Sequence, residues 1–251
     1  MIGGLAALVL ACLMRIPLPP TTNQRWMLLL SGFCGFVGFP VLFTLGIAHT
    51  SANHASMILA SLPIFTGAIA LLWDKRIPKP LWWLGCTVAL AGEFLLIGSD
   101  NTQASESTVY GDMLVLVSNL FASLGYVVGG RLQQQGYPAT GTTFWGAAIF
   151  SLLLLPIGIY FGATGAVAEA SVASWLAIAY LAIGVTIVGY VCWYWALGKG
   201  GIARVGLLQF LQPISGVILA WILLAEYVDL NFLLSSAIIL FGVWIALKAK
   251  D

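Results

Sequence analysis

The chain is divided into long apolar runs that are separated by short joints rich in proline and glycine. A helix needs about 20 mostly apolar residues to cross the hydrocarbon core of a bilayer, whereas a buried strand runs only about 4–8 residues. The length of the runs therefore predicts helices that cross a membrane. We expect nine of them, at residues 2–16, 26–48, 51–73, 81–98, 111–130, 142–161, 172–196, 202–224 and 230–247.

The composition favours a lipid-facing exterior. Of the 251 residues, 61% are hydrophobic and 8% are charged, whereas a soluble domain carries about 25% charged residues. So few charges cannot coat a surface that faces water. The predicted fold class is all-α, a polytopic transmembrane helix bundle, and the lipid bilayer is its first expected partner.

Several classes of function are disfavoured by the motif content. The net charge is +1 and the basic residues form no run, so no nucleic-acid partner is expected. The cysteines show no metal-ligand spacing, so neither a metal nor another cofactor is expected. The sequence contains no GxxxxGK[ST], HExxH or GxSxG motif, which disfavours direct ATP drive and an intramembrane enzyme.

The charged residues predict an orientation. All ten lysines and arginines fall on one side of the membrane in the nine-span arrangement, in alternate joints, at the span ends beside them or in the C-terminal tail, and cytoplasmic loops collect these residues. We therefore expect a multi-pass protein of the bacterial inner (plasma) membrane with a cytoplasmic C-terminus. The same parity puts Met1 outside, so a helix before Met1 is expected to be missing; a true nine-span protein is the alternative.

A shift of 150 residues aligns the two halves of the chain. Pro63 falls on Pro213, and Gly92 falls on Gly242. The two proline-bearing spans run in opposite directions through the membrane, as in the inverted repeats of secondary transporters. We expect a first repeat with four helices present, an extracytoplasmic linker and a second repeat with five helices. These are residues 1–98, 99–110 and 111–248.

Five short stretches carry motifs whose order and spacing are more specific than any one of them alone. The first half supplies one, and the second half supplies four that include a Gly-Asp helix start, an Ala-Trp-Ile-Leu-Leu-Ala-Glu run and an Ile-Leu-Phe-Gly run. They are residues 50–65, 111–112, 201–213, 220–226 and 239–242.

Taken together, these stretches resemble the EamA-type family of the drug/metabolite transporter (DMT) superfamily over nearly the whole chain. Two positions depart from the family pattern, since Gln212 stands where an acidic residue is common and Arg76 stands at the first-half equivalent of Glu226. The resemblance implies ten helices in two inverted five-helix repeats, a central substrate cavity and alternating access. It leaves the substrate open among amino acids, nucleotide sugars, sugar phosphates and drugs.

Two prolines and two glutamines are candidates for the substrate cavity. Pro63 and Pro213 lie near the middle of their predicted spans, where proline frees a carbonyl one turn earlier. Gln209 and Gln212 lie three residues apart on one helix face, where their amides can hold a polar or zwitterionic ligand. The alternatives are a packing kink for the prolines and hydrogen bonds to neighbouring helices for the glutamines.

A polar stripe predicts a second set of cavity residues. Asn119, Ser123 and Tyr126 follow i, i+4, i+7 spacing on one span, so they share a face that points into the bundle. Ser61 shares a face with His54, one heptad earlier, and Asn53 lies beside His54. We expect Asn53, Ser61 and the three residues of the stripe to contribute to the cavity lining.

Two ionisable residues are candidates for proton coupling. Glu93 is the only carboxylate placed clearly inside a predicted span, and an intramembrane acid is a functional candidate by default. His54 is the other candidate, because histidine titrates near neutrality; each side chain is near enough to a helix end to reach the interface instead. Phe36 shares a face with Pro40 and Phe43 and is a candidate for an apolar cavity wall.

These features predict a secondary transporter that exports small organic metabolites, amino-acid-like or drug-like, by alternating access. The expected partners are the small-molecule substrate, the bilayer and protons, with facilitated diffusion and a homodimer left open. The alternatives are a metabolite uptake permease and a non-transporting or truncated membrane scaffold.

Overall fold

The computed structural model is helical throughout the part of the chain that it describes, and that part contains no strand. The all-α class is therefore confirmed, and the described residues of the predicted spans lie mostly in helical segments. Three continuous stretches are long and apolar enough to cross a membrane: Thr22–Ile47, Val109–Gln134 and Val172–Gly200. The described residues are 2–50, 52–98, 108–163, 171–212, 214–215, 218–219, 222 and 230–249.

The helices form two compact units, and each unit takes its helices from both halves of the chain. Unit 1 comprises Met1–Gly38 and Leu124–Gly200, and unit 2 comprises Phe39–Ser123 and Gly201–Asp251. In unit 1 lie α1 (Ile2–Leu13), α2 (Thr22–Phe33), the π-helical η1 (Cys34–Gly38), the second part of α7 (Val109–Gln134), α8 (Ala139–Leu153), α9 (Leu155–Ala163), α10 (Val172–Ala179), the π-helical η2 (Tyr180–Gly189) and α11 (Tyr190–Gly200). In unit 2 lie α3 (Phe39–Ile47), α4 (Ala52–Leu59), α5 (Leu62–Trp73), α6 (Pro80–Gly98), the first part of α7, α12 (Ile202–Gly206), the 3-10 helix η3 (Leu207–Leu211) and α14 (Leu230–Lys248).

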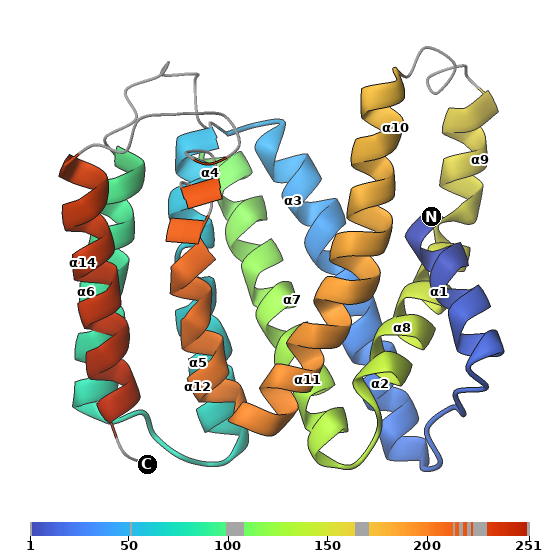
Figure 1. Cartoon of the computed structure of the whole chain (residues 1–251), viewed down its shortest axis with the longest axis horizontal. Helices are drawn as coiled ribbons and strands as arrows, with labels where there is room; N and C mark the ends of the chain where they lie inside the picture. The colour runs from blue at the N-terminus through green and yellow to red at the C-terminus, as the bar shows by residue number, and fades with distance from the viewer. Residues whose placement is uncertain are drawn as a thin grey trace. The chain divides into compact units, whose positions relative to one another are not determined.

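In unit 1, α1 packs against α8 through small residues (Figure 1). Ala7 and Ala11 are buried there with Ala147 of α8, and small side chains let two helix backbones approach closely. The segment after α1 is tied to the same helix, because Trp145 Nε1 donates a 3.1 Å hydrogen bond to the carbonyl of Ile16.

In unit 2, α6 and α14 lie side by side along their lengths (Figure 1). A methyl group at Gly92 would lie 2.9 Å from the backbone nitrogen of Ile239, and one at Gly242 would lie 2.8 Å from Cα of Ala89. Glycine is needed at both places because neighbouring backbone occupies the space of a side chain. The order of these contacts along the two helices also shows that α6 and α14 run in opposite directions.

The 150-residue offset of the sequence recurs in the structure. Gly92 of α6 (Pro80–Gly98) and Gly242 of α14 (Leu230–Lys248) are 150 residues apart, and so are Ala89 and Ile239. The contacts of Gly92 with Ile239 and of Gly242 with Ala89 are equivalent under the same offset. Two equivalent helices therefore pack antiparallel across a local two-fold relation, which is the arrangement that inverted repeats require.

The span at residues 51–73 is broken at its centre. Helix α4 ends at Leu59, and α5 begins at Leu62 with Pro63 in its first turn. The prediction placed Pro63 near the middle of one helix; the structure instead uses it to start a new helix. Proline is well suited to the first turn, where its missing N–H removes no intrahelical hydrogen bond.

Candidate substrate site

A small cavity in unit 2 brings together four of the residues that the sequence singled out. Its volume is about 180 Å³. It is formed by α4, the α4–α5 turn, the start of α5, α6 and the end of η3. The lining residues are Ser56, Leu59, Ala60, Pro63, Glu93, Gln209 and Gln212.

Glu93 supplies the acidic group of this cavity. It lies in α6, directly after the Gly92 that packs against α14. The side chain is 2% exposed, and its Oε2 has no hydrogen-bond partner among the described residues. A carboxylate is costly to bury in an apolar bundle unless it is neutralised or paired. This position therefore suits a group that exchanges a proton or pairs with a cationic group of a ligand.

Gln209 supplies both a donor and acceptor to the same cavity. It lies in η3, is 4% exposed, and neither its Oε1 nor its Nε2 has a partner within the described part of the chain. Gln212 also lines the cavity but is exposed. Buried amides in native proteins are almost always paired. An unpaired amide beside a cavity is therefore well placed to bind a polar solute.

The polar stripe on α7 contacts the broken helix and does not line this cavity. Asn119 Nδ2 donates to the carbonyl of Ile58 (2.6 Å) and to Ser61 Oγ (3.2 Å), while its Oδ1 has no partner among the described residues. Ser123 Oγ donates to the carbonyl of Leu62 at 3.4 Å.

The same carbonyl of Leu62 also accepts a 2.9 Å hydrogen bond from Thr66 Oγ1, and Thr66 contacts Ser123 Oγ at 3.2 Å. Side chains from α5 and α7 thus donate to backbone carbonyls on both sides of the helix break at Pro63. We call Ser61, Thr66, Asn119 and Ser123 the helix-break network.

Two other predicted cavity residues lie in unit 1, within a group of aromatic rings. The ring centroid of Phe36 lies 4.8 Å from that of Tyr190, and Tyr126 lies 6.2 Å from Tyr190 and 5.6 Å from Trp193. Tyr190 OH donates to the carbonyl of Gly35 at 3.3 Å. Phe36 and Tyr126 therefore share one aromatic cluster in unit 1.

Three predicted residues fall outside the description. The side chains of Asn53 and His54, in α4, are not part of it, and Pro213 follows the last described residue of that stretch, Gln212. The residues missed by sequence reasoning are Ser56, Leu59, Ala60 and Thr66. The first three precede Pro63 at helical spacing (i, i+3, i+4, i+7), so the face could have been found by extending the stripe backwards from Pro63.

Metal-ligand groups are not among the features of this site. Within the described ranges, no group of three or more His, Cys, Asp or Glu side chains is placed to hold a metal ion.

The fold and the site together define the class: an all-α, multi-pass membrane protein whose apolar helices enclose a small polar cavity. The EamA-like transporter family matches residues 1–98 and 109–248. The chain therefore belongs to the EamA-like transporter family.

Similar proteins of known sequence are transporters by name. The uncharacterized transporter YdeK of Bacillus subtilis is 32% identical over 209 residues, which cover 83% of this chain and 71% of that protein. The uncharacterized transporter YdfC of the same organism is 28% identical over 246 residues, 97% of this chain and 78% of that protein. A probable terminal-alkyne amino-acid exporter of Streptantibioticus cattleyicolor is 24% identical over 230 residues, 89% of this chain and 73% of that protein.

A solved crystal structure of a protein has the same fold. It superposes with a TM-score of 0.77 at 19% sequence identity and covers 98% of this chain and 83% of that chain. At that identity the likeness shows the helical architecture alone.

Proposed function

We propose that this protein is a secondary transporter that exports small, amino-acid-like metabolites across the bacterial inner membrane by alternating access. The observation that carries the proposal is the 180 Å³ cavity in which Glu93 and Gln209 hold buried polar atoms without partners among the described residues. Polar groups of this kind inside a membrane bundle are expensive and are typical of substrate and ion pathways.

The size and polarity of the cavity favour an amino-acid-sized solute. Sites for drug-sized ligands are about 300–1,000 Å³, so 180 Å³ suits a smaller molecule. The amides of Gln209 and Gln212 can donate to a carboxylate and accept from an ammonium group. The Glu93 carboxylate can pair with the ammonium group, and the name of the amino-acid exporter relative agrees with this chemistry.

Glu93 also provides a means of proton coupling. In the absence of a cationic ligand, its charged form is unfavourable in the apolar bundle, so conformational change is easier after a proton binds. A cycle follows in which substrate binding on the inside releases the proton and protonation from the outside promotes return. His54 remains a second proposed coupling residue.

The orientation is part of the same proposal. Lysine and arginine lie on one side of the nine-span arrangement, which supports a cytoplasmic C-terminus. The two repeats, 1–98 and 111–248, with the linker 99–110 between them, are proposed to rock about the substrate site. The equivalent contacts of Gly92 with Ile239 and of Gly242 with Ala89 support the repeat assignment.

A transport assay with purified protein in proteoliposomes tests the proposal. Liposomes are loaded with amino acids and their analogues, and efflux is measured with and without an imposed pH gradient. We expect protein-dependent efflux of at least one amino-acid-like solute, faster when protons are available to exchange. Movement of solute into the liposomes without efflux would indicate an uptake permease. No movement of any tested solute would favour the scaffold alternative.

Two variants test whether transport depends on the polar groups of the cavity. In Gln209→Leu/Gln212→Leu the cavity loses its amides, and we expect efflux to fall to the level of empty liposomes. The control is Thr143→Val, which removes a buried hydroxyl of unit 1 that has no described hydrogen-bond partner. Equal efflux in both variants would contradict the assignment of the cavity.

A further inference from the structure

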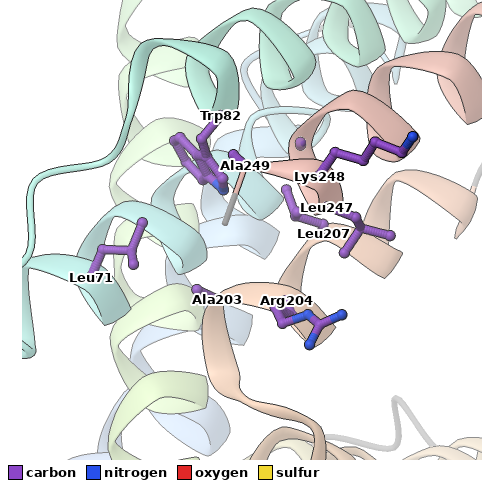
Figure 2. Close-up of a pocket in the computed structure, with 9 residues that line it drawn as sticks. Leu71, Trp82, Ala203, Arg204, Leu207, Leu247, Lys248 and Ala249 are labelled. Carbon is purple, nitrogen blue, oxygen red and sulfur yellow. The ribbon is translucent and has the colours of Figure 1, made fainter. Parts of the chain in front are cut away.

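A second cavity in unit 2 lies among the helix ends at which α5 and α14 finish and α6 and α12 begin. Its volume is about 650 Å³. Figure 2 shows Trp82 and Leu71 on one side of it and Arg204 and Lys248 on the other. The lining is completed by Ala203, Leu207, Ala246, Leu247 and Ala249.

The charges around this cavity all have one sign. Arg204 stands near the start of α12, and Lys248 stands in the last turn of α14. An adjoining cavity of about 350 Å³ shares Leu71, Trp82 and Ala249 and adds two more basic residues, Arg76 and Lys79. None of the described residues that line either cavity is acidic. Arg204 and Lys248, the two bases that line the larger cavity, give it a positive potential that attracts an anion.

A buried donor points to a ligand at the same place. Trp82 is 5% exposed and lines both cavities, yet its indole Nε1 has no hydrogen-bond partner among the described residues. A buried indole N–H normally finds an acceptor. An oxyanion in the cavity would supply this acceptor, and Arg204 and Lys248 line the same cavity.

We propose that the two cavities bind the phosphate headgroup of an anionic phospholipid. Leu71, Leu207 and Leu247 give the larger cavity an apolar wall, and the same helical segments carry the exposed apolar side chains Leu72, Leu208 and Trp244. A free phosphate would leave this apolar surface uncovered, whereas a phospholipid presents a phosphate and acyl chains together. Basic hollows between helix ends on the cytoplasmic side are typical places for such headgroups.

Lys248 lies beside an exposed aromatic ring. Its Nζ lies 4.1 Å from the centroid of the Trp244 ring, and Trp244 is exposed. A cation over an aromatic ring at a helix end is typical of residues at a membrane interface. The proposed lipid site shares no lining residue with the cavity around Glu93.

Lipid binding to the purified full chain tests the proposal. Native mass spectrometry in neutral detergent compares phosphatidylglycerol with phosphatidylcholine of the same acyl chains. For the unmodified protein we expect phosphatidylglycerol to bind at least about tenfold more tightly, because each nearby base adds to the attraction. For Arg204→Gln/Lys248→Gln we expect this preference to fall by about tenfold or more. Both side chains are exposed, so folding should be retained.

The matched control is Arg131→Gln/Lys199→Gln, which removes two bases that line neither cavity. Its preference for phosphatidylglycerol should stay within about twofold of the unmodified protein. An equal loss in both double variants, or no loss in either, would overturn the site.

Competition with inorganic phosphate and glycerol phosphate distinguishes a lipid headgroup from a free phosphate as the ligand. Displacement of the lipid by either compound at similar concentrations would refute a lipid site. The result does not depend on whether the protein transports amino acids.

Discussion

The two faces of the helix break at Pro63 differ in how their polar groups are satisfied. On one face, Asn119, Ser123 and Thr66 donate hydrogen bonds to the carbonyls of Ile58 and Leu62. On the other face, Glu93 and Gln209 approach the same segment with buried polar atoms that have no described partner.

The comparison separates two uses of polar residues inside a membrane. Groups that satisfy the backbone stabilise the break, and their hydrogen bonds already exist in the folded chain. Groups that stay unpaired destabilise the fold and are retained where a ligand or a proton needs them. Substitutions on the first face should therefore lower stability, whereas those on the second should lower transport and leave stability unchanged or raised.

The largest expected effect is on proton-driven transport in Glu93→Gln. The variant keeps the size of the side chain and removes the titrating group, so driven efflux should fall by about 100-fold, equivalent to about 2.7 kcal/mol. Substrate exchange without a gradient should continue, because it needs no net proton movement. Efflux from proteoliposomes with and without a pH gradient measures both.

The control for this variant is Asp112→Asn. Asp112 accepts a hydrogen bond from Thr50 Oγ1 near the start of α7, so its carboxylate already has a protein partner. We expect proton-driven efflux per folded molecule to be retained. Normal driven efflux in Glu93→Gln would exclude Glu93 as the coupling group.

The next effect is on stability, in Asn119→Leu. The substitution removes two donated hydrogen bonds and leaves the carbonyl of Ile58 without its Asn119 partner, so the free energy of unfolding should fall by about 2 kcal/mol. Unfolding in detergent measures it. Asn231→Leu is the control, because its Nδ2 has no partner among the described residues and its loss should not destabilise. A stable Asn119→Leu variant that fails to transport would place Asn119 on the functional face.

For Gln209→Leu we expect smaller effects: the protein should become more stable but bind its substrate more weakly. Removing a buried unpaired amide should raise stability by about 1 kcal/mol, while the apparent KM for the substrate should rise about tenfold, equivalent to about 1.4 kcal/mol. Gln133→Leu also removes a buried unpaired oxygen, but in unit 1, so it should affect stability without changing KM. An unchanged KM in Gln209→Leu would show that the substrate does not bind beside Gln209 in this cavity.

Much of the fold could be predicted from the lengths of the apolar runs and from the internal repeat. Runs of about 20 apolar residues specify membrane-spanning helices, and the all-α class is confirmed on that basis. The 150-residue offset predicted from Pro63 and Gly92 recurs in the contacts of Gly92 with Ile239 and of Gly242 with Ala89 between α6 and α14. The π-helical segment Cys34–Gly38 follows the same offset, since its counterpart lies within Tyr180–Gly189. The sequence did not predict either π-helical segment, because an extra residue per turn depends on packing and has no composition of its own.

The site was only partly predictable for a related reason. Glu93, Gln209 and Pro63 stand out because polar and helix-breaking residues are rare in apolar spans. Asn119 and Ser123 stand out in the same way, yet they bind the backbone carbonyls of Ile58 and Leu62. Spacing along one helix gives the face of a residue but not the helix that it meets. Which polar groups are satisfied and which are free becomes visible only when the helices are packed together.

The smallest effect tests the helix-break network at its weakest contact. Ser123→Ala removes the 3.4 Å hydrogen bond to the carbonyl of Leu62 and the acceptor of Thr66. Hydrogen bonds between helices in a membrane are worth about 0.6 kcal/mol on average, so we expect a loss of about that size. Ser118→Ala, on the same helix, removes only a local bond to the carbonyl of Val115 and should be nearly neutral. Equal losses in the two variants would mean that contact with the broken helix adds nothing to stability, and the distinction between the two faces would then depend on Asn119 alone.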